Sequence, residues 1–264
     1  HALNTEHLTQ VSRGLEVGRC CTGRRLGAVE QAPPVAVHAL RPRRREAAAE
    51  MFRQVTAKDP AYAPAHAGLA IAHALNAVPS GSPIPFVVTQ SIIRTAAERA
   101  FELDPLLPDA HEAMGWVLAG ELDWSGAEEA FNQAIALNPS LSQTYLSYSA
   151  STLRPLGKRD EALRLLRVAL QNDPLSLSVQ REIGLVQMEN GQYEEAVSTL
   201  EHVGARAGTE PGFPGVDEFL ARALVFAGRP ADALAVFERT APVRQPKPPP
   251  GQRRGNPRMV LAYV

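Results

Sequence analysis

The histidines are the side chains of this sequence best suited to hold a metal ion, but their spacing does not fit one. His66 and His73 lie seven residues apart, whereas two ligands of one ion on a helix need the spacing i and i+4. His111 stands beside Glu112, and adjacent helical residues point to different faces. We therefore predict that these histidines serve packing and that the chain holds no metal.

Groups that could act as nucleophiles or hold a phosphate are equally scarce. Cys20 and Cys21 are the only cysteines; a disulfide between neighbours is strained, and two thiols do not complete a zinc site. The sequence has no glycine-rich phosphate loop and no GxSxG turn. Two acidic pairs stand near the starts of predicted helices, where they complement the helix dipole: Glu128 with Glu129 and Glu194 with Glu195. We predict no catalytic residue, no cofactor and no small-molecule substrate, hence no enzyme.

A helix-ending signature that recurs four times defines the elements that would position any functional side chain. Each copy is Asp-Pro or Asn-Pro after a run rich in Ala, Glu and Leu, with the prolines at Pro60, Pro105, Pro139 and Pro174. Proline cannot continue a helix, and it pushes the preceding residue out of the helical region, so each copy turns the chain. The spacings are 45, 34 and 35 residues. A period near 34 predicts a stack of two-helix units.

The residues ahead of each proline indicate how the units pack. Five, eight and twelve residues before Pro139 stand Ala134, Phe131 and Ala127, a stripe of small, large and small side chains on one helical face. Alanines let two helices approach while the larger residue fills the gap between them. The first helix of each unit follows the proline, with Gly115 on its inward stripe. The pattern predicts an all-α stack of antiparallel helix pairs.

This pattern resembles the tetratricopeptide repeat, whose template has a bulky residue, Leu, Gly or Ala, an aromatic, and later Ala, Phe or Tyr, Ala and Pro. On that template a half unit precedes five repeats: 46–60, then 63–105, 108–139, 142–174, 177–208 and 214–245. The resemblance implies a right-handed superhelical solenoid over residues 46–240. We predict a basic, irregular or disordered segment over 1–45, and a Pro/Arg-rich tail with the start of a truncated helix over 241–264.

Charge divides the chain in the same way. Residues 1–45 hold eight Arg against three Glu, and residues 241–264 hold five Lys or Arg and no acid; since the whole chain carries −1, residues 46–240 carry −11. An acidic array argues against nucleic-acid binding by the repeats, because phosphate binding needs a cationic face. Residues 13–45 lack helical periodicity, which suggests either a disordered tail or translation of coding DNA in an alternate frame.

No long apolar run and no signal-like segment occur, so we expect no membrane span and a cytoplasmic protein. The chain begins with His1, which suggests a fragment of a longer protein.

In the tetratricopeptide family, the first helices line a concave groove, and the ligand-facing positions are the second, fifth, ninth, twelfth and thirteenth of each repeat. Carried over, the resemblance implies a partner-binding groove formed by Asp109, Glu112, Trp116, Gln143, Leu146, Arg154, Arg181, Leu185, Met188, Glu218, Arg222 and Phe226. Such side chains are expected to be free of packing. Trp116 is the strongest anchor candidate, since aromatic residues and Arg dominate binding hot spots; the alternative is that it packs.

The members of this family that bind chaperone tails hold a terminal carboxylate with a Lys and Asn clamp, which these positions lack. A mixed, partly apolar groove suggests instead an extended or helical partner segment. A neighbouring domain of the same full-length protein is the other expected occupant.

A closer resemblance links residues 46–240 to the repeat region of large bacterial multidomain regulators. It rests on the run 61–70 with the proline-rich loop after it, on Asp109-Ala110-His111, and on Leu122-Asp123-Trp124. In those proteins a winged-helix, adenylate cyclase or Ser/Thr kinase domain precedes the repeats. The resemblance implies a non-catalytic protein-interaction module, a sensory or docking arm in signalling or transcription regulation. The alternative is a regulatory fragment of a larger cyclase or kinase whose catalytic domain is missing.

Overall fold

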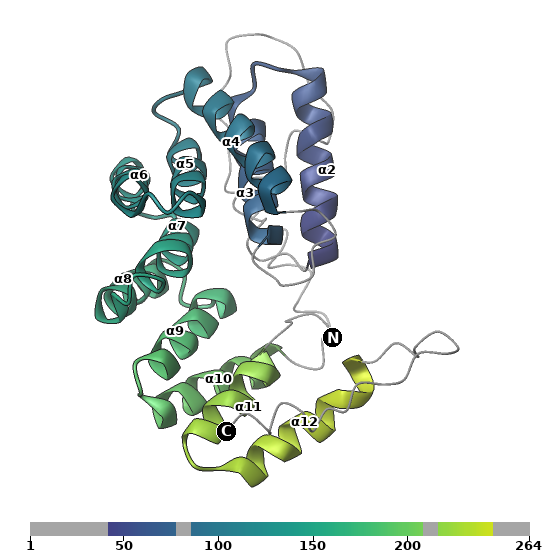
Figure 1. The fold of residues 1–264 in the computed structure, drawn as a ribbon, viewed down its shortest axis with the longest axis vertical. Coiled ribbons are helices and arrows are strands. Elements are labelled where there is room, and N and C mark those ends of the chain that lie inside the picture. Colours follow the sequence, from purple (N-terminus) through teal and green to yellow (C-terminus); the bar gives the residue numbers. More distant parts are fainter. Residues whose placement is uncertain (1–41, 78–85, 208–215, 245–264) are drawn as a thin grey trace, which may run out of the picture. The chain divides into compact units, whose positions relative to one another are not determined.

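The computed structural model describes residues 42–77, 86–207 and 216–244, all of them in helices or in the short turns between helices (Figure 1). The helices are α2 (Pro42–Lys58), α3 (Ala63–Ala77), α4 (Phe86–Leu103), α5 (Pro108–Gly120), α6 (Trp124–Leu137), α7 (Ser142–Tyr148), the π-helix η3 (Ser149–Leu153), α8 (Arg159–Asn172), α9 (Leu177–Glu189), α10 (Tyr193–Ala207), α11 (Val216–Phe226) and α12 (Pro230–Arg244). Helix α2 begins four residues before the predicted start of the solenoid, with Pro42 at its first position, where no backbone N–H is needed.

Several predictions from the sequence lie outside the described residues. They concern Cys20 and Cys21, the basic segment up to residue 41, the proline-rich loop at 79–85 and the tail from residue 245 onward.

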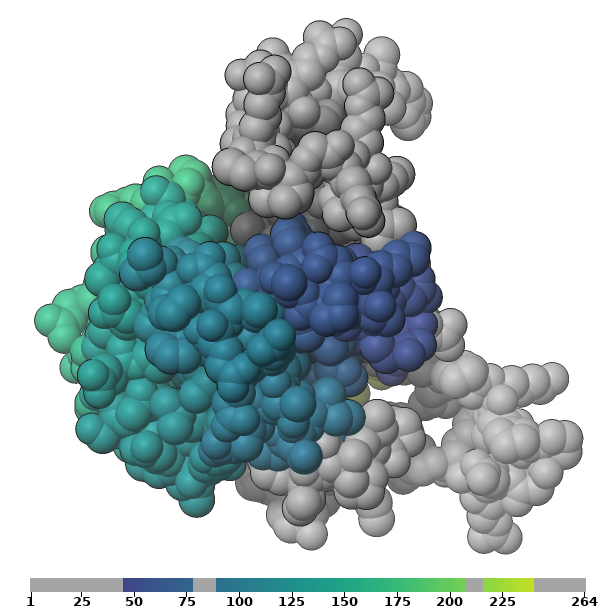
Figure 2. Space-filling model, turned by 90° about the horizontal axis from the view of Figure 1, so that it is seen from above, coloured from purple at the N-terminus to yellow at the C-terminus, as the bar shows by residue number. Residues whose placement is uncertain are grey.

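Consecutive helices pack as antiparallel pairs, which confirms the all-α solenoid predicted from the period (Figure 1). The pairs are α3 with α4, α5 with α6, α7–η3 with α8, α9 with α10, and α11 with α12. In addition, each first helix contacts the first helix of the next unit. We call α3, α5, α7–η3, α9 and α11 the first-helix row. Seen from above, α2 and α3 form one continuous surface with the helices that follow (Figure 2).

The stripe of small and large residues fixes how closely the helices approach. A Cβ added at Gly115 would lie 2.7 Å from the ring of Phe131, so the glycine is what allows α5 and α6 to touch. In the first pair the large position carries Ala97, and the ring against Gly68 comes instead from Phe52 of α2, 2.6 Å from where a Cβ would stand. Phe52 of α2 thus fills the space that a large side chain of α4 would otherwise fill.

The Asp-Pro and Asn-Pro signatures act through two repeated hydrogen bonds. The side-chain oxygen of the Asp or Asn accepts the N–H two residues later: Ala61 to Asp59 at 3.1 Å, Leu106 to Asp104 at 3.0 Å, Ser140 to Asn138 at 3.1 Å and Leu175 to Asp173 at 3.3 Å. These are Asx turns, which explains why Asp or Asn precedes each proline.

The residue six positions after each proline closes the same joint by bonding to the carbonyl of that proline. The bonds are His66 to Pro60 at 3.1 Å, His111 to Pro105 at 2.8 Å, Tyr145 to Pro139 at 2.9 Å and Gln180 to Pro174 at 3.0 Å. His66 and His111 therefore have a structural role in these joints. In the described part of the chain no group of His, Cys, Asp and Glu side chains could hold a metal ion.

The turn from first to second helix is left-handed at one residue in each of the four units whose turn the structure describes. Gly157, Gly191 and Gly228 have φ of 71°, 77° and 75°, but the equivalent residue after α5 is Leu122, with φ of 65° and 68% of its surface exposed. Glycine tolerates this conformation at little cost, whereas leucine does not. The turn after α5 is therefore under local backbone strain.

The π-helix η3 accounts for the one-residue difference between the 34- and 35-residue units. At the end of the first helix, the carbonyl of Leu118, Leu153 or Gln187 accepts a hydrogen bond from the N–H of the residue five positions later. These three residues stand 13, 14 and 13 residues after the proline that precedes their helix. The extra residue of the third unit is thus taken up in the single π-helical turn at residues 149–153.

Among the described helices, none is long and apolar enough to cross a membrane.

A candidate partner-binding face on the first-helix row

The twelve residues predicted to line the groove do not share one environment. Five are buried: Glu112, Trp116, Leu146, Leu185 and Met188. Four are half-buried, namely Asp109, Gln143, Arg154 and Arg181, and three are exposed, namely Glu218, Arg222 and Phe226. The expectation that these side chains are free of packing is wrong for the buried five. Partner binding at any of the twelve stays a prediction.

Direct contact between successive first helices is what covers these positions. Leu185 and Met188 of α9 belong to one buried cluster with Leu220 and Leu224 of α11. Leu146 of α7 belongs to a second cluster that also holds Trp116. Aliphatic side chains at such positions gain more from burial than from exposure, and this chemical signal was available in the sequence.

Glu112 is buried because α7 supplies donors for both of its oxygens. The hydroxyls of Thr144 and Ser147 donate to the Glu112 carboxylate at 2.8 Å each, and the side chain is 2% exposed. A buried carboxylate is tolerated when it is hydrogen-bonded in this way. Glu112 therefore joins α5 to α7 rather than facing a partner.

Arg154 makes a matching connection from η3 to α9. Its guanidinium donates to Glu182 at 3.0 Å and binds both oxygens of Glu189, and the hydroxyl of Ser149 lies 3.4 Å from Glu182. Burial lowers the pKa of Arg154, but the hydrogen bond and charge of Glu189 and the charge of Glu182 outweigh it, and the pKa is raised. This ion-pair network fixes the position of η3 on α9.

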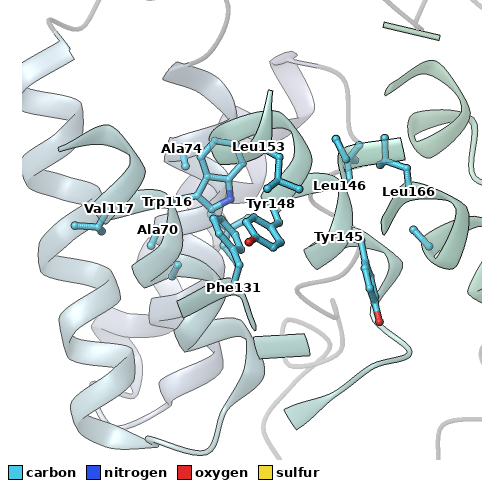
Figure 3. Packing of buried hydrophobic residues seen from close by; sticks show 14 of the residues in the cluster. Ala70, Ala74, Trp116, Val117, Phe131, Tyr145, Leu146, Tyr148, Leu153 and Leu166 are labelled. Atoms are coloured by element: carbon cyan, nitrogen blue, oxygen red, sulfur yellow. The ribbon is translucent and has the colours of Figure 1, made fainter. Parts of the chain in front are cut away.

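An indentation on the first-helix row surrounds Trp116. This hollow of about 210 Å³ is lined by Ala74, Ala77, Gln90, Ile93, Trp116, Ala119, Gly120, Ala150 and Ser151. We call it the Trp116 hollow. Figure 3 shows the indole between Ala74 and Leu153, next to the rings of Phe131 and Tyr148, which stack with centroids 5.2 Å apart. The indole is 8% exposed, and its Nε1–H has no hydrogen-bond partner in the described part of the chain.

A second apolar feature lies at the other end of the row. Tyr193 of α10 and Phe226 of α11 stack with ring centroids 5.5 Å apart, and they are 36% and 50% exposed. Phe226 is one of the predicted groove positions, whereas Tyr193 lies outside that pattern because it begins a second helix.

Residues 149–208 match a family model described as tetratricopeptide repeat. No curated protein sequence matches this chain. Among solved structures, human IFIT1 with m7Gppp-AAAA is similar at a TM-score of 0.61 and 23% identity, over 75% of this chain and 46% of that one. This chain therefore spans less than half the length of IFIT1.

Two pilus proteins are similar over most of their own length. Pseudomonas aeruginosa PilF matches with a TM-score of 0.56 and 20% identity, over 72% of this chain and 80% of that one. PilW, a type IV pilus biogenesis factor, matches with a TM-score of 0.53 and 20% identity, over 68% and 80%. At these identities the likeness concerns the fold alone. The tetratricopeptide repeat match thus covers residues 149–208, and the helix pairs on either side share the fold of these solved structures.

Proposed function

We propose that this chain is a non-catalytic protein–protein interaction module whose first-helix row binds a segment of a partner protein. The observation that carries the proposal is the Trp116 hollow, where small side chains on α3, α5 and η3 leave space beside an indole ring. Aromatic residues in partly enclosed pockets are the usual anchors of protein interfaces. The site thus offers apolar contact to a partner.

The role we infer for this module is a sensory or docking arm in bacterial signalling or transcription regulation. This inference rests on the sequence resemblance described above. The alternative is that the chain is a regulatory fragment of a larger cyclase or kinase. In both cases the repeats bind a partner, and a separate domain carries out the activity. A neighbouring domain of the full-length protein would then be a partner alongside separate proteins.

The acidic charge supports a protein partner over a nucleic acid. Residues 46–240 carry −11 by the count given above, and a polyanion approaching such a surface is repelled. The capped RNA in the IFIT1 structure is a property of that protein. For this chain an oligonucleotide is a control ligand.

The test is selection of peptides from a displayed library on the immobilised full chain, followed by titration of each selected peptide. Ala77→Leu should weaken binding, since Ala77 is half-buried and lines the Trp116 hollow. Ala136→Leu makes the same change at an exposed position on α6 and should leave affinity unchanged. A library that yields no peptide sensitive to Ala77→Leu, or tighter binding of oligoadenylate than of any peptide, would contradict the proposal.

A further inference from the structure

We propose that Asn190 is a site of spontaneous deamidation, and that its conversion to aspartate weakens the contact between α8 and α9. Asn190 and Gly191 form the only Asn-Gly step in the sequence, in the turn between α9 and α10. Neither residue lines the Trp116 hollow, so the modification is independent of the proposed function.

The reaction needs only these two residues and water. The main-chain nitrogen of Gly191 loses its proton and attacks Cγ of Asn190, which forms an N–C bond and closes a five-membered succinimide ring. The bond from Cγ to the side-chain nitrogen breaks, and that nitrogen leaves as ammonia. Water then opens the ring at either carbonyl, giving aspartate, or isoaspartate in which Gly191 is attached through Cγ. Glycine favours the attack because it has no side chain to obstruct its nitrogen.

The turn leaves the reacting groups accessible. Asn190 is exposed, and a Cβ built on Gly191 would meet nothing within 4 Å. Ring closure requires a rotation about the Cα–C bond of Asn190, away from its ψ of 5°. Two main-chain hydrogen bonds must open for this rotation: the N–H of Gly191 donates to Met188 at 3.2 Å, and the N–H of Gln192 donates to Gln187 at 2.9 Å. Exposed turns open locally at much lower cost than the whole protein unfolds.

The side chain of Asn190 joins two neighbouring units. Its amide Nδ2 donates to the carboxylate Oδ1 of Asp160 at 3.2 Å. Asp160 lies in the first turn of α8, and Asn190 caps the C-terminal end of α9; these two helices pack against each other. In this contact asparagine is the donor and the carboxylate is the acceptor, and deamidation removes the donor.

Aspartate at position 190 turns an attractive contact into a repulsive one. Its carboxylate would stand where the amide now donates to Asp160, and like charges at that distance repel. The new charge would also lie at the C-terminal end of α9, where the helix dipole disfavours negative charge. Glu189 beside it already carries a negative charge and binds Arg154. The modification should therefore loosen the packing of the α7–η3 and α8 pair against α9.

The site is tested by incubating the full chain at physiological temperature and at several pH values, followed by tryptic digestion and mass spectrometry. Cleavage after Arg181 and Arg206 releases residues 182–206, in which Asn190 is the only asparagine. This peptide should gain mass with time as the amide becomes an acid. The rate should rise with pH, because the attack needs the deprotonated main-chain nitrogen of Gly191.

Asn172 is a matched control in the same molecule. It is exposed, it ends α8, and its amide donates to the carbonyl of Pro139 at 2.7 Å, but the residue after it is Asp173. Asn190 should convert at least about tenfold faster than Asn172, because glycine leaves its nitrogen unobstructed. A synthetic peptide of residues 186–194 is incubated alongside. Equal conversion of the two asparagines, or an intact Asn190 while the synthetic peptide converts, overturns the proposed site.

The structural consequence is tested on Asn190→Asp, which carries the charge of the product from the start. Its urea unfolding midpoint should be lower than that of wild type, whereas Asn190→Gln, which keeps the amide, should lie closer to wild type. Adding Asp160→Asn to Asn190→Asp exchanges donor and acceptor and should restore most of the lost midpoint. An Asn190→Asp protein as stable as wild type, or a double variant no more stable than the single one, overturns the proposed weakening of the contact between α8 and α9.

Discussion

Replacing Leu122 by glycine should stabilise the protein, although it removes a large apolar side chain. Leu122 occupies the left-handed turn position with φ of 65°, where three other units have glycine. The left-handed conformation costs a non-glycine residue about 1–2 kcal/mol, while the extra unfolded-state entropy of glycine costs about 0.5–1 kcal/mol. Because Leu122 is 68% exposed, its packing contributes little. We expect a net gain of about 0.5–1 kcal/mol in the free energy of unfolding.

The assay is urea unfolding followed by far-ultraviolet circular dichroism, with the melting temperature as a second readout. For a chain of this size the gain corresponds to a rise of about 1–4 °C. Gly191→Ala is the reciprocal control, since Gly191 has φ of 77° and a Cβ there would meet nothing within 4 Å. It should destabilise by about 1 kcal/mol through backbone strain alone. A Leu122→Gly protein that is less stable than wild type would refute the reasoning and show that the leucine side chain contributes more than its exposure indicates.

Three further predictions concern packing, buried charge and pH. Gly115→Ala should cost about 1–3 kcal/mol of unfolding free energy, because its Cβ would stand 2.7 Å from the Phe131 ring; Gly204→Ala, with no closer contact than 3.7 Å, should instead stabilise α10 by up to about 1 kcal/mol. Glu112→Ala should cost about 2–4 kcal/mol in urea unfolding, because two buried hydroxyls lose their acceptor, and Glu112→Gln should cost less. Burial lowers the pKa of His73 below its ordinary 6.5, so below pH 6.5 the unfolded chain binds more protons at this residue than the folded chain does. The free energy of unfolding should therefore decline as pH falls below 6.5, and His73→Gln should make this decline shallower in thermal unfolding.

Each of these has an outcome that contradicts it. Equal responses to alanine at Gly115 and Gly204 would mean that the ring of Phe131 moves aside freely. A Glu112→Ala protein as stable as wild type would show that the hydroxyls of α7 find other acceptors. An unchanged pH profile in His73→Gln would assign the acid sensitivity to other groups.

The fold could be predicted from the sequence because its determinants are local. The prolines and the residues before them set the joints through Asx turns, and the stripe ahead of each proline sets the packing of the second helix. The glycine at 115 and the phenylalanine at 131 meet as their spacing indicated. One packing detail could not be read in this way, since Phe52 fills the space beside Gly68 from a neighbouring unit. That contact depends on how units stack.

The candidate site was less accessible to sequence reasoning for the same physical reason. Whether a first-helix residue faces solvent depends on how closely the next first helix approaches, and this distance is set by side chains one period away. Glu112 resembles a solvent-exposed acid until Thr144 and Ser147 are brought to it. Trp116 stays a predicted anchor, and the hollow beside it is lined largely by residues of other helices, such as Ala74, Ala77 and Ala150.

The π-helical turn at residues 149–153 has a consequence for how this array could change in length. An added residue in an ordinary α-helix rotates everything after it by about 100°, which would turn the next apolar stripe away from its neighbour. Here the wider turn absorbs the addition, and the following helix α8 keeps its small, large, small stripe of Ala162, Leu166 and Ala169 in phase. One unit of the array can therefore lengthen by a residue without a change in how the following units pack. Insertions at the ends of first helices are the ones that such a chain can accumulate.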